Sequence, residues 1–318
     1  MSALRLSRAA LGVIAALVLA GCGGQVAPTG GAPQSLATAT HGKSWMLPAA
    51  KSGDLIYATG GCGGTCVLSY PENKVVGSLS VGRGGGTCVD GSGDVFIGNN
   101  NTIVEYAHGG STPIATLNLP GDNAEGCSVD PTTGNLAVIF AGDKLGVAIF
   151  PDASGSPTTY VSGIDSIGCG YDNKGDLFVS GYDGQLPGLS ELPAGETQFS
   201  ILNISYEVGW PRQVQWDGHY MSYEGGNKGH ITASRLRISG STATVMRVTH
   251  FRGITGSAYL SWIYNDKILI PFSPKHTPEA SLIGAWKYPG DGKALSVYRP
   301  SGKPPGVNFF AVTLSVAR

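Results

Sequence analysis

The cysteines are the residues of this 318-residue sequence whose type and spacing most directly suggest chemistry. Two of them stand four positions apart, in Cys62-Gly-Gly-Thr-Cys66. In an oxidising compartment such a pair can close a small-loop disulfide, and otherwise it stays as two thiols. A metal site would need more ligands than two cysteines, and no histidine stands beside them. Cys62 and Cys66 are therefore a candidate disulfide, and we predict no metal centre there.

Three further cysteines occupy related positions in a repeated motif. Cys127 and Cys169 each stand three residues before a turn aspartate, whereas Cys88 stands two before its own. Because side chains alternate along a strand, Cys88 should point to the opposite face from the other two. We expect all three to be small buried hydrophobic residues. A bond between Cys127 and Cys169 would need their Cα atoms within about 7 Å, which the sequence leaves open.

The other motifs that would announce catalysis do not occur in the sequence. We find no hydrolase nucleophile elbow, no phosphate-binding glycine loop and no helical zinc pair. The glycine-rich run 82–86 falls between predicted strands, so a phosphate cradle is not expected there. Repeated Asp-x-x-Gly-Asp turns lack the length and the terminal glutamate of a calcium loop. We predict no catalytic residue and no cofactor, and a divalent cation has no specific support.

The sixth cysteine, Cys22, ends an export signal. Arg5 and Arg8 precede an apolar run of 11 residues, 9–19, which is too short to span a bilayer as a helix. The run leads into Leu-Ala-Gly-Cys22, which resembles the bacterial lipobox, whose cysteine receives diacylglycerol. An ordinary signal peptide before a chance cysteine is the alternative. We predict a signal peptide (1–21), a lipidated N-terminus and flexible linker (22–43), and a cell-envelope, extracytoplasmic location anchored in the lipid bilayer. The resemblance to sorted bacterial lipoproteins implies that Gly23, in place of Asp, favours the outer membrane, if the organism has one.

Composition narrows the class of the remaining domain. The formal net charge is -1, only 14% of residues are charged, and there are 49 glycines. A nucleic-acid-binding protein needs a basic surface, so no nucleic-acid partner is expected. Hydrophobic residues make up 42% of the chain, enough to supply a core. Many glycines with few charges favour an all-β protein with many tight turns.

A hairpin motif recurs along the chain and predicts the architecture. Its clearest copies are 86–97, 126–138 and 168–179, each of which reads as strand, Asp- and Gly-containing turn, strand. A third strand follows each hairpin, ending at Tyr70, Tyr106, Phe150, Leu192, Ile238 and Tyr288, with separations of 36, 44, 42, 46 and 50 residues. Fourth strands follow these. Such a period is typical of a β-propeller with four-stranded blades.

We predict an all-β fold, a propeller over residues 44–318 with six blades, while seven remain an alternative. The apolar segment 309–316 should complete the sheet that the start of the domain begins, and so close the ring. An irregular β-sandwich is the competing fold, but it would not repeat one hairpin motif in register.

The pattern Val-Asp-x-x-Gly-Asp-Val-Phe-Ile (89–97) followed by Ile-Val-Glu-Tyr (103–106) resembles the repeat of NHL-type propellers and of their gluconolactonase-like and streptogramin-lyase-like relatives. It is similar to that of uncharacterised bacterial propeller lipoproteins. The motif specifies blades and is nearly silent on chemistry. The lactonase resemblance implies a metal held by Glu, two Asn and Asp, and no such set can be assigned here. The lyase resemblance implies a histidine base, for which His230 and His276 are loop candidates.

In a propeller, the loops that join strands two to three and strands four to one emerge on one face, around the channel. Function tends to lie on such loops. The polar residues predicted there are Arg83, Asn100, Asp122, Glu125, Asp143, Asp165, Tyr182, Asp183, Glu224 and His276. Their carboxylates and amides would suit a cation, a sugar or a basic peptide.

Three functional hypotheses follow from these features. The first is a non-catalytic scaffold that binds an unidentified small molecule or protein. The second is a metal-dependent enzyme of lactonase-like or lyase-like type at the channel mouth. The third is a subunit of an envelope assembly, which predicts a broad exposed apolar patch. We favour the first, because no catalytic set can be identified.

Overall fold

The computed structural model describes residues 43–141, 146–205, 208–227, 230–254, 256–274, 281–299 and 308–318. They belong to one compact unit, residues 40–318. The predicted signal peptide, Cys22, nearly all of the linker, Asp143 and His276 lie outside the described residues. Within the described part of the chain, none of the helices has the length and apolar character needed to cross a membrane.

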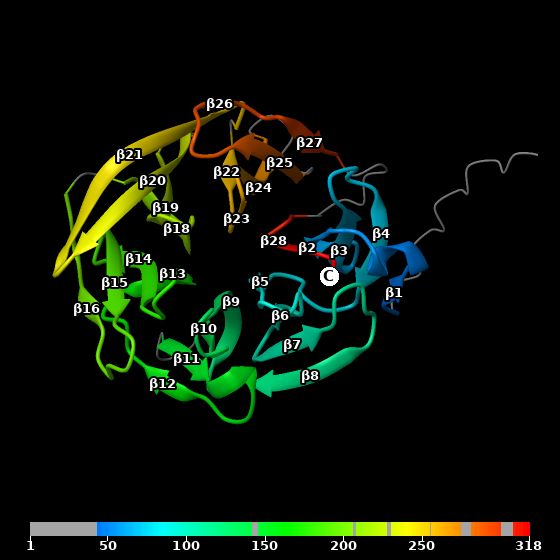
Figure 1. The fold of residues 1–318 in the computed structure, drawn as a ribbon, viewed down its shortest axis with the longest axis horizontal. Helices are drawn as coiled ribbons and strands as arrows, with labels where there is room; N and C mark the ends of the chain where they lie inside the picture. The colour runs from blue at the N-terminus through cyan, green and yellow to red at the C-terminus, as the bar shows by residue number, and fades with distance from the viewer. Residues whose placement is uncertain are drawn as a thin grey trace, which may run out of the picture. The chain divides into compact units, whose positions relative to one another are not determined.

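Six sheets, antiparallel except for two short strands in blade 5, surround one axis and are here called blades 1 to 6 in chain order (Figure 1). Blades 2, 3 and 4 are regular four-stranded sheets in which the first strand lies innermost. They comprise β5 (Thr87–Val89), β6 (Val95–Asn99), β7 (Thr102–Tyr106) and β8 (Pro113–Asn118); β9 (Asp122–Val129), β10 (Leu136–Ala141), β11 (Gly146–Phe150) and β12 (Thr158–Tyr160); and β13 (Asp165–Tyr171), β14 (Leu177–Asp183), β15 (Leu186–Leu192) and β16 (Ser200–Ile201).

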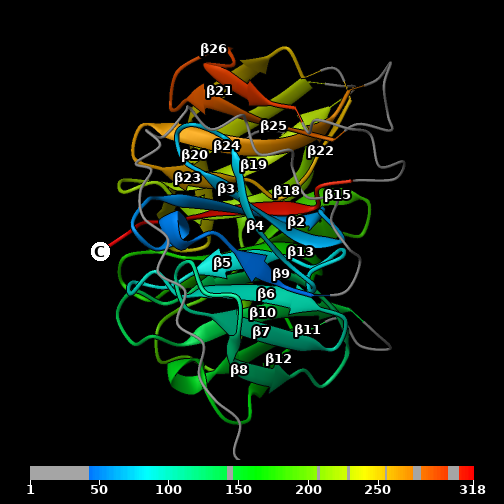
Figure 2. The ribbon, with the colours of Figure 1, turned by 90° about the vertical axis from the view of Figure 1, so that its right-hand side faces the viewer.

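Blade 1 is built from both ends of the described chain. Its strands are β1 (Trp45–Met46), β2 (Leu55–Gly61), β3 (Gly64–Ser69), β4 (Val75–Leu79) and, innermost, β28 (Ala311–Ser315). Figure 2 shows β28 beside β2, with which it pairs from Leu55↔Ser315 to Thr59↔Ala311. The prediction of six blades closed by the C-terminal strand is confirmed, and the sandwich and seven-blade alternatives are wrong. Residues 48–51 form a 3₁₀ turn, η1 (Pro48–Lys51), ahead of β2.

Blades 5 and 6 are less regular. Blade 5 contains β18 (Trp210–Trp216), β19 (Met221–Asn227), β20 (His230–Ser239) and β21 (Thr242–Arg252), and β17 (Asn203–Ile204) and β26 (Gly292–Lys293) each pair with β21 in parallel. The segment 200–204 is therefore divided between blade 4, which contains β16, and blade 5, which contains β17. Blade 6 contains β22 (Ser257–Ala258), β23 (Trp262–Tyr264), β24 (Lys267–Ser273), β25 (Leu282–Lys287) and β27 (Ser296–Tyr298). Both β22 and β23 pair with β24, so the inner strand of this blade is interrupted at 259–261.

The hydrophobic core lies between the blades. Buried apolar residues form one cluster at each junction, and alternation along a strand sends neighbours to different clusters. Phe96 packs in the junction of blades 2 and 3, whereas Ile97 packs in the junction of blades 1 and 2. Burying a side chain of this size stabilises the fold by about 1.5–3 kcal/mol. Each blade therefore depends on both of its neighbours.

Local turn chemistry builds the strand one to strand two hairpins. Asp90, Asp130 and Asp172 each accept hydrogen bonds from backbone N–H groups of their own turn. Gly93 and Gly175 adopt positive φ in two of these turns, a conformation that glycine adopts without strain. We call the side of the ring where these hairpins emerge the hairpin face, and the opposite side the loop face.

One inner-strand position links blades 2, 3 and 5 to the blade that follows each of them. Cys88 in blade 2, Ser128 in blade 3 and Gln215 in blade 5 hold it, as judged by their pairing with the second strand. Ser128 accepts a hydrogen bond from the Tyr171 N–H at 3.1 Å. The Gln215 amide bonds both the N–H and the carbonyl of Ile263, at 2.8 and 3.1 Å. These contacts fix the register of adjacent inner strands.

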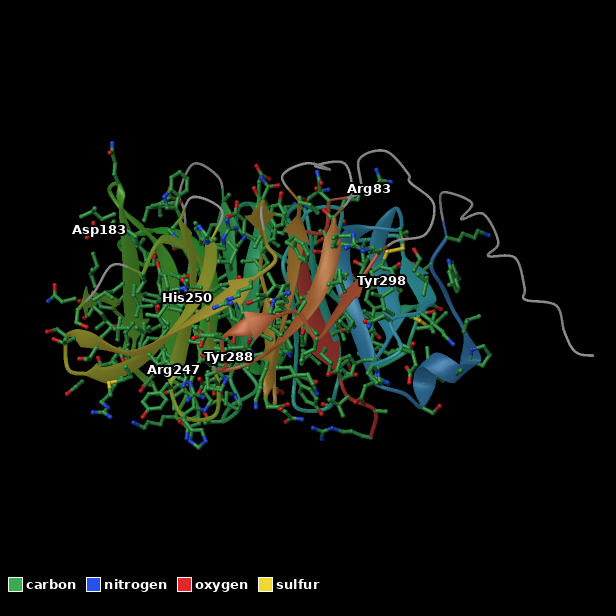
Figure 3. All side chains as sticks on the ribbon, turned by 90° about the horizontal axis from the view of Figure 1, so that it is seen from above. Arg83, Asp183, Arg247, His250, Tyr288 and Tyr298 are labelled. Atoms are coloured by element: carbon green, nitrogen blue, oxygen red, sulfur yellow. A yellow bond between two sulfur atoms is a disulfide. The ribbon has the colours of Figure 1, made fainter. Side chains whose placement is uncertain are left out.

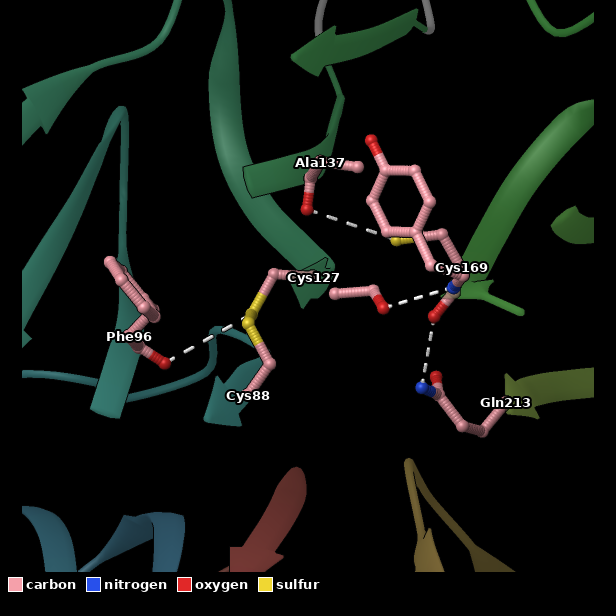
Figure 4. Close-up of a disulfide and its surroundings, with 8 residues drawn as sticks. Cys88, Phe96, Cys127, Ala137, Cys169 and Gln213 are labelled. Atoms are coloured by element: carbon pink, nitrogen blue, oxygen red, sulfur yellow. Dashed lines mark hydrogen bonds between the residues drawn. A yellow bond between two sulfur atoms is a disulfide. The ribbon is translucent and has the colours of Figure 1, made fainter. Parts of the chain in front are cut away.

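At the same position, Cys88 forms a disulfide with Cys127 of the next blade, with the Cα atoms 5.6 Å apart (Figure 4). The expectation that both are merely small buried residues is therefore wrong. Each junction is formed by one face of a blade and the opposite face of the next blade. Because Cys88 and Cys127 point to opposite faces of their own blades, both side chains enter the same junction and meet. Cys169 faces the same way as Cys127 and its thiol donates toward the Ala137 carbonyl, so these two cannot meet. A second disulfide joins Cys62 to Cys66 between β2 and β3.

Candidate functional site

The structure distributes the predicted loop-face residues widely around the ring. Arg83 and Asp183 lie at the same face but far apart (Figure 3). Strands extend further than predicted, so several of the residues lie in strands rather than loops, namely Asp122 and Glu125 in β9, Asp165 in β13, Tyr182 and Asp183 in β14, and Glu224 in β19. Arg83, Asn100, Asp122, Asp165 and Asp183 are exposed, Glu125 and Tyr182 are half-buried, and Glu224 is buried.

Two of these carboxylates influence one another. Burial raises the pKa of Glu125, and the negative charge of Asp165 on the next blade raises that pKa further. The two inner strands approach closely here, because Gly126 leaves room for the Ile167 backbone, where a Cβ would come within 3.1 Å of the carbonyl oxygen. This pair forms an acidic edge at the loop face. Among the residues that the structure describes, no group of three or more His, Cys, Asp or Glu could hold a metal ion.

A bulge occurs at equivalent places in the inner strands of blades 3, 4 and 5. It falls at residues 125–126, at Ile167 and at residues 212–213, as the shifts in strand register show. In blade 5, Arg212 and Gln213 together face the single residue Glu224 on β19. Bulges of this kind redirect side chains and are common beside functional sites.

Glu224 is only 2% exposed, and neither carboxylate oxygen has a hydrogen-bond partner among the described residues. Burial raises its pKa to about 7. Ser261 of blade 6 and the positive charge of Arg212 act in the opposite direction but are outweighed, and no donor of Ser261 meets hydrogen-bond geometry. Arg212 Nε is also buried and has no hydrogen-bond partner among the described residues. Within the described part of blade 5, a carboxylic acid and a guanidinium therefore lie close together without forming an ion pair.

The hairpin face carries two grooves that our reading of the sequence missed. One, of about 570 Å³, lies between blades 4 and 5, and the other, of about 970 Å³, lies between blades 2 and 3. Phe178 and Glu191 line the first, and Phe96 and Glu105 occupy the same blade positions in the second. Blade 3 has Ala137 and Ile149 there, and Tyr171 packs against them. The sequence motif repeats a Phe in the second strand and a Glu in the third, and this repetition could have indicated the two grooves.

The sheets, their connections and their closure define the protein as a six-bladed β-propeller. No known family model matches the sequence, and no curated protein is similar to it. Solved structures share the fold. A chain in the crystal structure of the nidogen/laminin complex superposes with a TM-score of 0.62 at 13% identity, over 84% of this chain and 100% of that chain.

Two bacterial structures are similar in the same way. A protein of unknown function from Bacteroides caccae has a TM-score of 0.61 at 12% identity, over 83% of this chain and 99% of that chain. A putative TolB from Agrobacterium tumefaciens has a TM-score of 0.54 at 13% identity, over 83% and 98%. At such identities the likeness shows the fold and carries no activity.

Proposed function

We propose that the protein is a lipid-anchored, extracytoplasmic β-propeller that serves as a non-catalytic scaffold for a ligand or partner. The observation that carries this proposal is the pair of disulfides, Cys62–Cys66 and Cys88–Cys127, within the ring. Disulfides persist in exported proteins and are rare where thiols are kept reduced. They support the export that the segment ending at Cys22 predicts. The acidic edge formed by Glu125 and Asp165 is the loop-face surface that we propose for the partner.

The oxidation state of the ring gives the first test. The ring contains five cysteines, 62, 66, 88, 127 and 169. Protein purified without reductant, then unfolded and alkylated, should take up one label, at Cys169, and five after reduction. Mass spectrometry reads the number directly. Five labels without reduction would remove the main support for an exported protein.

The anchor is tested by replacing Cys22 with Ser and following the protein through membrane fractionation and lipid labelling. We expect the wild-type chain to be labelled and membrane-bound, and the variant to be unlabelled and released. Cys169→Ser is the matched control, because it removes the remaining unpaired ring cysteine and should leave the anchor intact. A Cys22→Ser chain that kept its label and stayed in the membrane would contradict the anchor.

The absence of catalysis is tested on the purified wild-type protein. We expect no stoichiometric divalent ion by elemental analysis and no turnover of lactone substrates. A tightly held divalent ion together with lactone turnover would overturn the scaffold and favour a lactonase-like or lyase-like enzyme instead.

A further inference from the structure

The groove between blades 4 and 5 lies on the hairpin face, away from the acidic edge proposed for the partner. Its volume of about 570 Å³ falls within the roughly 300–1,000 Å³ of small-molecule pockets. Phe178, Met221 and Leu236 are its buried apolar residues. Such a floor with polar groups around it is the usual composition of a ligand site.

Two aromatic residues of the β18–β19 hairpin, Trp216 and Tyr220, form one side of the groove, and both remain partly exposed. The Tyr220 N–H donates to Asp217 Oδ1 at 2.9 Å. The Arg235 guanidinium lies 5.4 Å from the centre of the Tyr220 ring and does not itself line the groove. Tyr220 is therefore supported from outside the groove.

That support is itself held rigidly. Arg235 Nε lies 2.6 Å from Asp217 Oδ2, and the Asp217 side chain is fully buried. Tyr288 of blade 6 donates its hydroxyl to the same oxygen at 3.1 Å, and its ring lies 5.5 Å from the Arg235 guanidinium. Side chains locked in this way lose little conformational entropy on binding. Tyr220 is thus held in place before a ligand binds.

The polar residues of the groove have free hydrogen-bonding capacity. The Glu191 side chain is half-buried and makes no hydrogen bond or ion pair with any described residue. Burial, followed by the charges of Asp176 and Asp172, raises its pKa. The Lys174 and Arg237 side chains are exposed at the groove and are likewise without hydrogen bonds to the described residues. Hydrogen-bond acceptors and donors therefore line the same groove.

The equivalent groove between blades 2 and 3 shows what is particular to this one. Val129 replaces Trp216 at the matching position of the inner strand. Four carboxylates line that groove, from Asp90, Glu105, Asp130 and Asp152, and its one described cationic side chain is Arg318. Trp262 of blade 6 also lines that groove, but it lies outside the two blades that form it. The groove therefore lacks the pair of hairpin aromatic residues and the near balance of charge found between blades 4 and 5.

From these contrasts we propose that the groove between blades 4 and 5 binds a neutral saccharide. A sugar ring presents an apolar C–H face that stacks on Trp216 and Tyr220, while its hydroxyls donate to Glu191 and accept from Lys174 and Arg237. Three carboxylates (Asp172, Asp176 and Glu191) and two cationic side chains (Lys174 and Arg237) line the groove and largely offset one another, so neither an organic cation nor an anion is strongly favoured. The inference does not depend on the lipid anchor or on the loop-face partner.

The test uses the full chain, purified in a detergent without a sugar headgroup, against immobilised neutral oligosaccharides and polysaccharides, with calorimetry on the best of them. We expect saturable binding that weakens at least about tenfold in Trp216→Ala and in Glu191→Gln. Val129→Ala and Glu105→Gln change the equivalent groove and should leave affinity unchanged. Trp216→Phe keeps a stacking ring and should recover part of the affinity, which separates stacking from misfolding.

Three outcomes would overturn the proposal. They are no binding to any neutral saccharide on the panel, binding that Trp216→Ala and Glu191→Gln leave intact, and displacement of the sugar by spermidine, which would point to a cation site. Since none of these measurements requires Cys22 or the loop face, a failure here leaves the proposed scaffold function standing on its own tests.

Discussion

The junction between blades 5 and 6 contains two buried carboxylates that differ in whether they have hydrogen-bond and ion-pair partners. At the hairpin face, Asp217 bonds Arg235 and the Tyr288 hydroxyl. Toward the loop face, Glu224 meets no hydrogen-bond donor in good geometry within the described part of the chain, and Arg212 lies beyond ion-pair distance. Among the described residues, blade 5 thus contributes one paired and one unpaired acid to this junction.

The difference shows how position in the blade decides the state of a buried acid. Asp217 lies in the hairpin turn, where backbone N–H groups and a stacked guanidinium surround it. Glu224 lies on β19 opposite a bulge, beside the interrupted inner strand of blade 6. A buried carboxylate without partners is more stable in the neutral form, which is the physical meaning of its raised pKa.

Removing the paired acid should have the largest effect. Asp217→Asn takes the ion-pair partner from Arg235, whose side chain is only 18% exposed. Leaving a largely buried guanidinium without its carboxylate should lower the free energy of unfolding by about 3 kcal/mol. Chemical denaturation of the full chain at neutral pH measures this value.

Asp130→Asn is the matched control, because Asp130 occupies the same hairpin position in blade 3 but bonds only its own turn. We expect a loss of about 1 kcal/mol there. Equal losses in the two variants would show that Asp217 acts only as a turn residue, and the contrast between the two ends of the junction would then fail.

Removing the charge of the unpaired acid should have the opposite sign. A rise in the pKa of Glu224 from 4.5 to about 7 corresponds to about 3 kcal/mol. Between those pH values the folded chain keeps a proton that the unfolded chain has lost, so stability falls as pH rises and levels off above pH 7. Glu224→Gln cannot ionise, and we expect it to be about 2 kcal/mol more stable than wild type at pH 8.

The measurement is the difference in unfolding free energy between wild type and Glu224→Gln across pH 4 to 8.5. Taking the difference cancels the other titrating groups. Glu196→Gln, at an exposed loop position, should leave the profile of the wild type unchanged. A Glu224→Gln variant that is less stable at pH 8 would mean that the carboxylate has an ionic partner after all.

The fold could be predicted from the sequence because its signals are local. Turn residues such as Asp90 and Asp172 occupy fixed places between strands of alternating apolar and polar residues, and each copy of the motif indicates one blade. Blade 1 lacks an inner strand of its own, so the apolar strand near the C-terminus pairs with β2 there. The disulfide pairing was harder to predict from the sequence. The directions of the Cys88 and Cys127 side chains indicate a bond only when consecutive blades are placed side by side.

The candidate sites were predicted less well, because they depend on contacts between blades. Glu224 was expected on an exposed loop, yet β19 extends past it and blade 6 covers it. The groove between blades 4 and 5 combines a second-strand Phe178 and a third-strand Glu191 with Trp216 of the next repeat. The spacing of repeats along a sequence does not show which side chains of neighbouring blades line the same cavity.

A subtler change tests how Arg235 supports the paired end. Arg235→Lys keeps the charge but loses the planar group that lies between the Tyr220 and Tyr288 rings. We expect about 1 kcal/mol of destabilisation. The same variant should weaken any saccharide bound between blades 4 and 5, because Tyr220 loses its support. Unchanged stability in denaturation experiments would show that charge alone holds this end.

The smallest effect should come from Arg212, which acts on the unpaired end only through its charge. Arg212 lowers the pKa of Glu224, so Arg212→Gln should let that pKa rise further. The pH at which stability stops falling would then move upward, while the contribution of Glu224 to stability at pH 4 stays the same, because the folded chain keeps Glu224 protonated there with or without Arg212. We expect a change of less than about 1 kcal/mol at pH 8. In the double variant with Glu224→Gln this pH effect should vanish. If it persists, Arg212 acts on another group, and Glu224 is isolated from both of its neighbours.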